Sequence, residues 1–312
     1  MIFIFAPEDH HPNKKNYSSI IMSNTKFFFI TLCVFFGYFI SLPAQDQYGY
    51  TGFDSPVSVT QYGGHYYLSN SGQNFGLATK DGDGYISRIR SDGSQEDVTY
   101  KYITGLNNPR GIYAVQGTLY VCDIDRLVGI DVSSKKKVFE LSFEKDHVQQ
   151  LTAIASANDK VLYVSATDVN AIFEVNLSTK KYTKWTETTT PTGLLINNNK
   201  MYVCSMGTDS LPNGKIGVID MKSKQYAQLS DDEGYFWGLA LHGNKLYYSD
   251  WIQFAKRGVI KWINLNDHST GQVRFTSRIG GPAGFVYDAR NDMFIIPAVL
   301  EGVVFGCIGF TK

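Results

Sequence analysis

Residues 119–123 read Leu-Tyr-Val-Cys-Asp, in which two apolar residues flank an aromatic ring and small or polar residues follow. The same short pattern occurs six times, and its second residue is aromatic in every copy. Successive aromatic residues are 39 to 53 positions apart. A repeat of this period indicates a fold built from equivalent units. The copies are Tyr66-Tyr67-Leu68-Ser69-Asn70, Leu119-Tyr120-Val121-Cys122-Asp123, Leu162-Tyr163-Val164-Ser165-Ala166, Met201-Tyr202-Val203-Cys204-Ser205, Leu246-Tyr247-Tyr248-Ser249-Asp250 and Met293-Phe294-Ile295-Ile296-Pro297.

Each copy is preceded by a second motif of small or turn-forming residues that leads into an apolar strand. These motifs are Pro56-Val57-Ser58-Val59, Pro109-Arg110-Gly111-Ile112, Leu151-Thr152-Ala153-Ile154, Pro191-Thr192-Gly193-Leu194, Phe236-Trp237-Gly238-Leu239 and Pro282-Ala283-Gly284-Phe285. A third apolar run follows each copy, and polar stretches such as 133–137 (SSKKK) are typical of hairpin turns before a fourth strand. Four strands per unit of about 45 residues are typical of a propeller blade.

The predicted fold is therefore all-β, a six-bladed β-propeller of four-stranded antiparallel blades that fills residues 45–312 as one domain. A blade cannot bury both of its faces alone, so we expect the aromatic column to pack between neighbouring blades. The sixth unit lacks a full fourth strand after Phe310. We expect residues 48–53 to supply that strand and to close the ring.

The first 44 residues have the features of an export signal rather than of the propeller. Residues 27–42 form an apolar run that follows Lys26 and ends just before Pro43 and Ala44. We expect cleavage after Ala44, with Met22 as the natural start, and a secreted or periplasmic protein with no stable membrane anchor. A membrane anchor is the alternative, although the run is short for a span and no basic cluster follows it.

The composition excludes several classes of function. The chain has 29 basic and 29 acidic residues, so no basic excess points to nucleic acid. Cys122, Cys204 and Cys307 remain after the predicted cleavage, and their odd number and lack of a CxxC spacing indicate small buried residues rather than redox or metal groups. The sequence contains no nucleophile elbow, HExxH motif or phosphate-binding glycine-rich loop.

The run 107–131 (NNPRGIYAVQGTLYVCDIDRLVGID), with DGDGYISRI at 81–89 before it, resembles a secreted bacterial branch of the regucalcin/gluconolactonase superfamily, which is also NHL-like. The resemblance extends over the whole predicted mature chain and is most specific in the first two repeats. It implies a six-bladed propeller with a ligand site at one mouth of the central channel. In catalytic members of this superfamily a divalent metal, often calcium, sits there and assists lactone hydrolysis.

The positions at which the resemblance implies metal ligands carry other chemistry in this chain. Catalytic relatives hold the metal with acidic and amide residues at the start of the innermost strands. Here those positions are Val57-Ser58, Thr152-Ala153, Thr192-Gly193, Trp237-Gly238 and Ala283-Gly284. Hard cations need several oxygen ligands, usually with carboxylates among them. We therefore predict that the metal site is dismantled and that no cofactor is bound, with calcium expected only if the chain is a hydrolase.

Polar residues at the ends of the second strands form a second candidate ring at the channel mouth. These residues are Asn70, Asp123, Ala166, Ser205, Asp250 and Pro297. Asp123 and Asp250 belong to opposite blades, so they are expected to flank a ligand rather than to pair with each other. The alternative is that each aspartate caps a strand end through backbone N–H groups.

Arg110 and Trp237 are the most unusual residues at the starts of the innermost strands. The Arg110 guanidinium is suited to anchor a carboxylate or phosphate, or else to form a salt bridge with Asp123 or Asp125. Trp237 is placed either to stack on a flat ligand or to plug the channel. With Trp251 as a weaker candidate, the predicted ligand-binding set is Asn70, Arg110, Asp123, Thr192, Ser205, Trp237, Asp250 and Trp251.

Two functions from different classes follow. The favoured one is a non-catalytic propeller that binds a small organic ligand or a protein partner at the channel mouth. The alternative is a metal-dependent hydrolase of a lactone or ester, with a rearranged site that uses Asn70, Asp123 and Asp250.

Overall fold

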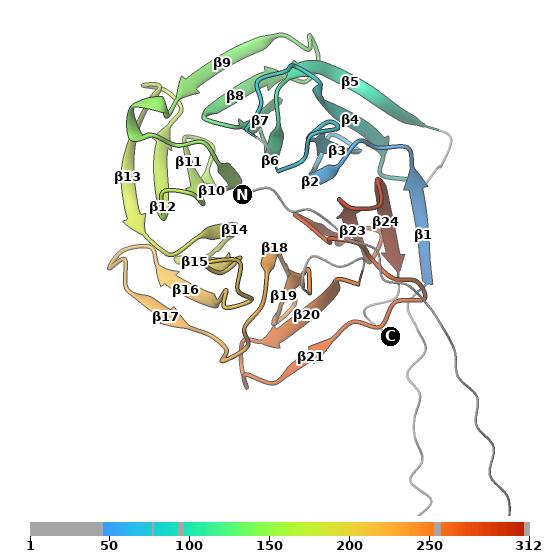
Figure 1. The fold of residues 1–312 in the computed structure, drawn as a ribbon, viewed down its shortest axis with the longest axis vertical. Helices are drawn as coiled ribbons and strands as arrows, with labels where there is room; N and C mark the ends of the chain where they lie inside the picture. Colours follow the sequence, from blue (N-terminus) through green and yellow to red (C-terminus); the bar gives the residue numbers. More distant parts are fainter. Residues whose placement is uncertain (1–45, 77, 93–96, 253–256, 309–312) are drawn as a thin grey trace, which may run out of the picture. The chain divides into compact units, whose positions relative to one another are not determined.

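The computed structural model describes residues 46–76, 78–92, 97–252 and 257–308, so the predicted signal lies outside it. Within these residues, six four-stranded antiparallel sheets surround a common axis as the blades of a β-propeller (Figure 1). The predicted fold class is therefore confirmed. No helix in the described part of the chain is long and apolar enough to cross a membrane.

The blades follow one another along the chain, each with its first strand innermost. Blade 1 contains β2 (Pro56–Tyr62), β3 (His65–Asn70), β4 (Gly84–Arg90) and β5 (Val98–Leu106). Blade 2 contains β6 (Pro109–Val115), β7 (Thr118–Asp123), β8 (Arg126–Asp131) and β9 (Lys137–Ser142), and the short 3-10 helix η1 (Glu144–Asp146) follows it. Blade 3 contains β10 (Leu151–Asn158), β11 (Val161–Ala166), β12 (Ala171–Asn176) and β13 (Lys181–Glu187).

The second half of the ring has the same strand order. Blade 4 contains β14 (Pro191–Asn197), β15 (Lys200–Ser205), β16 (Ile216–Asp220) and β17 (Tyr226–Gln228). Blade 5 contains β18 (Phe236–His242), β19 (Lys245–Asp250), β20 (Val259–Asn264) and β21 (Thr270–Gln272). Blade 6 contains β22 (Val286–Asp288), β23 (Met293–Ala298), β24 (Val303–Ile308) and β1 (Asp46–Thr51).

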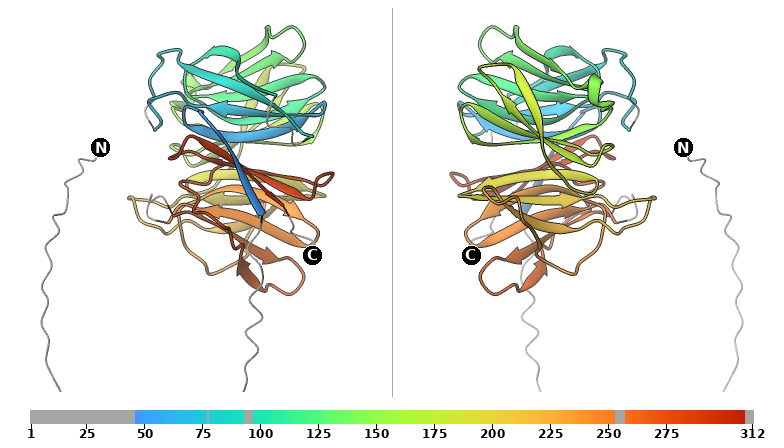
Figure 2. Two further views of the ribbon diagram at one scale, coloured as in Figure 1. Left: turned by 90° about the vertical axis from the view of Figure 1, so that its right-hand side faces the viewer. Right: turned by 90° about the vertical axis from the view of Figure 1, so that its left-hand side faces the viewer.

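The ring is closed by the N-terminal strand of the domain. β1 pairs antiparallel with β24 from Asp46–Ile308 to Thr51–Val303 and becomes the outer strand of blade 6 (Figure 2). The predicted closure is thus confirmed, with the strand at Asp46–Thr51 rather than at 48–53. The Tyr48 ring lies over Gly306, where an added Cβ would be 2.2 Å from the ring carbon Cζ.

The hydrophobic core is divided among the interfaces between blades. Six clusters of buried residues in the described chain each join two neighbouring blades, so every blade face is covered. Five motif aromatics pack against the following blade as predicted: Tyr67, Tyr120, Tyr163, Tyr202 and Tyr247. Because each interface needs a complementary neighbour, no blade is expected to be stable alone.

Blade 6 departs from the predicted alignment by one residue. Phe294 packs against Tyr247 of blade 5, at 4.8 Å between ring centres, instead of against blade 1. The bridge from Pro282 goes to Ala298, so Ala298 rather than Pro297 ends the second strand at the channel mouth. A shift of one residue turns every side chain to the other face of a strand. Ile295 therefore takes the place of the motif aromatic, in the cluster between blades 6 and 1.

Small residues at the third position of the innermost strands let those strands approach closely around the axis. An added Cβ at Gly238 would lie 2.2 Å from the Ala283 carbonyl oxygen, and one at Gly193 would lie 2.5 Å from that of Trp237. Glycine is required where backbones come this close. We call the channel end at which the innermost strands begin the proximal mouth and the other end the distal mouth.

Candidate functional site

The proximal mouth is lined by the second residue of each innermost strand segment. All six side chains are buried, and they are chemically unequal: one is an arginine, one an indole, two are threonines and two are apolar. They are Val57, Arg110, Thr152, Thr192, Trp237 and Ala283. All of these except Arg110 belong to the pairs at which the resemblance implied metal ligands.

Three aromatic rings close the proximal mouth. Trp237 stacks on Trp251 at 5.1 Å between ring centres, and Phe75 stacks on Trp251 at 5.9 Å. Trp237 is 6% exposed and Trp251 is 1% exposed, and both belong to a seventh core cluster that lies at the mouth rather than between two blades. Trp237 therefore plugs the channel, as one of its two interpretations predicted. Trp251 packs on the Trp237 ring and helps to hold it in this position.

Arg110 reaches into this aromatic cluster from the opposite side of the ring. It is 5% exposed, and its guanidinium carbon lies 5.8 Å from the ring centre of Phe75 and 5.9 Å from that of Trp237. Burial lowers the pKa of Arg110 to about 10, and the negative charge of Asp168 opposes the shift in part. The side chain is therefore a charged group at neutral pH in an environment that disfavours charge.

The Arg110 guanidinium makes no hydrogen bond and no ion pair within the described residues. Its nitrogens are also absent from the fully enclosed polar atoms that lack a partner in that part of the chain, so they keep some accessible surface. The alternative of a salt bridge to Asp123 or Asp125 is wrong, because both carboxylates have other partners. Asp125 accepts from Lys80 at 2.6 Å.

Asp123 is committed to its own blade. Its carboxylate accepts hydrogen bonds from Arg126 at 2.8 Å and from the backbone N–H groups of Asn107 and Asn108 at 2.9 and 2.8 Å. The side chain is fully buried. It thus caps the turn that leads into β6, as the structural alternative predicted, and does not point an unpaired oxygen at the mouth.

Asp250 has the matching position in blade 5 and a matching set of partners. Its carboxylate lies 2.9 Å from Lys261 Nζ and accepts from the backbone N–H groups of Tyr235 and Ile252. Lys261 also bonds Asp232 at 3.0 Å. Burial works against the charge of Lys261, but these two carboxylates outweigh it and raise the pKa of Lys261.

The remaining predicted site residues form hydrogen bonds with backbone groups and, in one case, with a neighbouring hydroxyl. The Asn70 amide donates to the Leu68 carbonyl and to the Ser87 hydroxyl, and the Thr192 hydroxyl donates to the Phe236 carbonyl at 2.7 Å. The Ser205 hydroxyl accepts from the Lys215 backbone N–H at 2.8 Å. These three side chains therefore fix strand ends. Of the predicted set, the structure brings Arg110, Trp237 and Trp251 into mutual contact, and Thr192 lies in the same ring.

Phe75 is the site residue that the sequence did not single out. It lies on the loop between β3 and β4, which crosses from blade 1 to contact blades 2 and 5: Asn108 donates to the Asn74 carbonyl, and Lys80 pairs with Asp125. The length of the segment 71–83 between two repeat strands is the sequence signal that could have marked it as part of a binding rim.

The residues of the proximal ring do not fit the calcium ion that the resemblance implies. An indole occupies one of the implied ligand positions, and the Arg110 guanidinium lies close to it in the same ring. The carboxylates at the ends of β7 and β19, Asp123 and Asp250, are already paired with Arg126 and Lys261. A hard cation would face a fixed positive charge and few free oxygen donors here.

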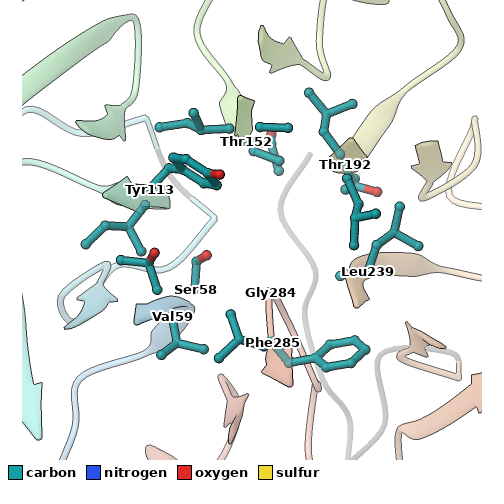
Figure 3. Close-up of a pocket in the computed structure, with 18 of the residues that line it drawn as sticks. Ser58, Val59, Tyr113, Thr152, Thr192, Leu239, Gly284 and Phe285 are labelled. Atoms are coloured by element: carbon teal, nitrogen blue, oxygen red, sulfur yellow. The ribbon is translucent and has the colours of Figure 1, made fainter. Parts of the chain in front are cut away.

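Below the aromatic plug, the central channel holds a cavity of about 220 Å³ (Figure 3). Thr152, Thr192 and Trp237, members of the same ring as Arg110, line it together with residues further along the innermost strands. Its lining contains hydroxyl groups and apolar side chains but no charged side chain of the described chain. This space accepts an uncharged group, such as the body of a small ligand.

The fold and this mouth define a six-bladed β-propeller with a closed, cationic channel end, and comparisons with known proteins show the same class. No protein-family model matches the chain, and no curated protein matches its sequence. Virginiamycin B lyase from Staphylococcus aureus is similar with a TM-score of 0.58 and 14% identity, over 85% of this chain and 100% of that one.

Two further structures show how varied proteins with this architecture are. Hydrazine synthase of Kuenenia stuttgartiensis is similar with a TM-score of 0.56 and 14% identity, over 80% of this chain and 75% of that one. A nidogen/laminin complex contains a chain with a TM-score of 0.56 and 12% identity, over 69% of this chain and 86% of that one. At such identities the likeness shows the fold alone.

Proposed function

We propose that this chain is a non-catalytic, exported binding propeller that holds a small organic anion at its proximal mouth, with Arg110 as the anchor. The observation that carries the proposal is the buried guanidinium of Arg110, which has no hydrogen-bond or ion-pair partner among the described residues. The relation to the regucalcin/gluconolactonase superfamily is part of the same proposal, since that superfamily has its ligand site at a channel mouth.

The cost of burying the Arg110 guanidinium favours a ligand that neutralises its positive charge. Withdrawing an ion from water costs several kcal/mol after relaxation of the protein. Two aromatic faces near 6 Å from the Arg110 guanidinium carbon are at the limit of the cation–π range, where each contributes about 0.5–1 kcal/mol. The rings therefore offset only part of the cost, and a bound anion would offset the rest.

The shape of the mouth suggests which anion. Arginine presents a planar fork of donors that matches a carboxylate in bidentate geometry. The rings of Phe75 and Trp237 and the uncharged channel cavity favour a flat or apolar body behind that carboxylate. An acidic side chain of a protein partner has the same anchoring chemistry. The hydrolase alternative has less support, because the oxygens of Asp123 and Asp250 are already engaged.

Calorimetric titration with benzoate, acetate and inorganic phosphate at low ionic strength tests the proposal. We expect benzoate to bind best, Arg110→Lys to weaken binding at least tenfold and Arg110→Met to abolish it. Arg90→Met is the matched control, because Arg90 is half-exposed and pairs with Asp92 at the surface. Absence of binding by all three anions, or equal binding by Arg110→Met, would overturn the proposal.

A further inference from the structure

A second cavity, of about 470 Å³, lies at the junction of blades 3 and 4 and shares no lining residue with the channel cavity. Its walls come from the loop after β13, the loop between β15 and β16, and the outer strand β17. These strands are labelled in Figure 1. We call this space the blade 4 groove. Its lining is rich in hydroxyl and amide side chains, which distinguishes it from the core clusters.

Tyr226 provides an aromatic platform in this groove. It is 47% exposed, one of the most exposed large apolar side chains of the described chain. Its ring lies over Gly217 of β16, where an added Cβ would be 2.2 Å from the ring carbon Cε2. The glycine thus seats one face of the ring against the sheet, and the other face is available to a ligand.

The loop after β13 contributes threonine hydroxyl groups to the groove. Thr188 and Thr189 lie at the groove, and neither side chain makes a hydrogen bond within the described residues. The next residue, Thr190, has a φ of +39°, which is unusual for a β-branched residue, and its hydroxyl lacks a partner within the described chain. Such backbone strain persists only where surrounding structure holds it; here the Asn170 side chain accepts from the Thr190 N–H at 2.8 Å.

The wall formed by the loop between β15 and β16 is held in place by the amide side chain of one asparagine. Asn213 accepts from the Thr208 backbone N–H at 2.7 Å and donates to the Thr208 hydroxyl at 3.2 Å, which fixes the loop between β15 and β16. The lysine in the groove, Lys215, is paired with Glu233, so it does not act as a free anion anchor. Glu187, the other charged side chain of the lining, is paired with Lys184 at 3.0 Å. The groups that remain around the aromatic face are therefore neutral hydrogen-bonding side chains.

We propose that the blade 4 groove binds a carbohydrate, with one sugar ring stacked on Tyr226 and its hydroxyls bonded by Thr188 and Thr189. The C–H face of a sugar is apolar and packs on an aromatic ring, whereas its rim of hydroxyl groups needs neutral donors and acceptors. The proposal is independent of the anion site at the proximal mouth. A single sugar ring in an open groove is expected to bind in the millimolar range, about −4 kcal/mol.

Saturation-transfer NMR with the methyl glycosides of glucose, galactose, mannose and N-acetylglucosamine, each at millimolar concentration, tests this assignment. We expect transfer to at least one glycoside, loss of the signal in Tyr226→Ala and retention in Tyr226→Phe, which keeps the ring. Tyr62→Ala, which removes a tyrosine of similar exposure from blade 1, is the matched control and should leave the signal intact.

Since Tyr226 is exposed, its replacement is expected to leave the fold intact, which a thermal unfolding curve verifies. Gly217→Ala is a second variant, because its methyl group would displace the tyrosine ring and weaken binding without removing it. No transfer to any of the four glycosides, or the same transfer in Tyr226→Ala as in the native chain, would refute the site. Arg110→Met should not alter the signal, which separates this site from the proximal mouth.

Discussion

The guanidinium carbon of Arg110 in blade 2 lies 5.9 Å from the ring centre of Trp237 in blade 5, so two opposite blades meet across the channel axis. A cation and an indole therefore close the proximal mouth. Trp237 occupies one of the positions at which the sequence resemblance implies a metal ligand. A fixed positive charge and an aromatic ring thus stand together where the resemblance implied oxygen ligands.

The charge of Arg110, which is buried and has no ion-pair partner in the part of the chain that the structure describes, should cost stability in the ligand-free protein. We expect Arg110→Met to raise the free energy of unfolding by about 1–4 kcal/mol, because an apolar side chain of similar length removes the buried ion and keeps the packing. Urea denaturation of both proteins without added anion measures the difference. Destabilisation by Arg110→Met would contradict this expectation and would mean that another group of the folded protein stabilises the guanidinium.

The cover formed by Phe75 gives a prediction that needs no ligand. Phe75 lies against both Trp237 and Trp251 from the loop between β3 and β4. Phe75→Ala should uncover the two indoles and increase quenching of tryptophan fluorescence by acrylamide, with little effect on unfolding because Phe75 is only half-buried. Tyr62→Ala serves as the control on a distant hairpin. Unchanged quenching in Phe75→Ala would show that other groups shield the indoles.

The architecture was predictable from the sequence because a blade repeats its own chemistry. The column at Tyr67, Tyr120, Tyr163, Tyr202 and Tyr247 recurs with the packing between blades, so period and pattern determine the fold. In blade 6 the prediction failed by one residue. The aromatic Phe294 fits the motif, but the strand register places Ile295 at the equivalent position, and register depends on pairing that composition does not reveal.

The site was predictable only in part, since its residues come from opposite blades. Position in the repeat identified Arg110 and Trp237, but nothing local to Arg110 showed that Asp123 would choose Arg126 instead. That choice follows from β7 and β8 pairing Asp123 directly with Arg126. Phe75 carries no repeat signature, because it lies on a loop whose course across the mouth is fixed by tertiary contacts.

The junction between blades 6 and 1 should make stability depend on acid. Asp288 is fully buried and accepts from Tyr66, from Gln61 at 2.8 Å and from Asn291 at 2.8 Å. Burial alone would raise the pKa of Asp288, but these hydrogen bonds and one from the Arg290 backbone outweigh it and hold the pKa below its usual value.

A carboxyl whose pKa is lowered in the folded state stabilises the protein above its unfolded pKa, near 4, and loses that contribution as the pH falls through the folded pKa. Asp288→Asn should therefore lower the free energy of unfolding at pH 7 by about 1.5–3 kcal/mol and flatten its decline below pH 4. Chemical denaturation at a series of pH values measures both effects. Asp159→Asn, at an exposed turn, is the control. An unchanged slope below pH 4 in Asp288→Asn would contradict the assignment.

Calcium provides the sharpest test between binding propeller and hydrolase. Arg110 stands in the ring where the ion would sit, and Asp123 and Asp250 are each neutralised by a cation of their own blade. We therefore expect a calorimetric titration of the metal-stripped protein with calcium to give no heat at the mouth. Asp123→Asn and Asp250→Asn should then leave the calcium response unchanged while weakening the caps of β6 and β18. A stoichiometric calcium heat that either substitution abolishes would instead support the rearranged metal site, and lactones and simple esters would be the substrates to assay next.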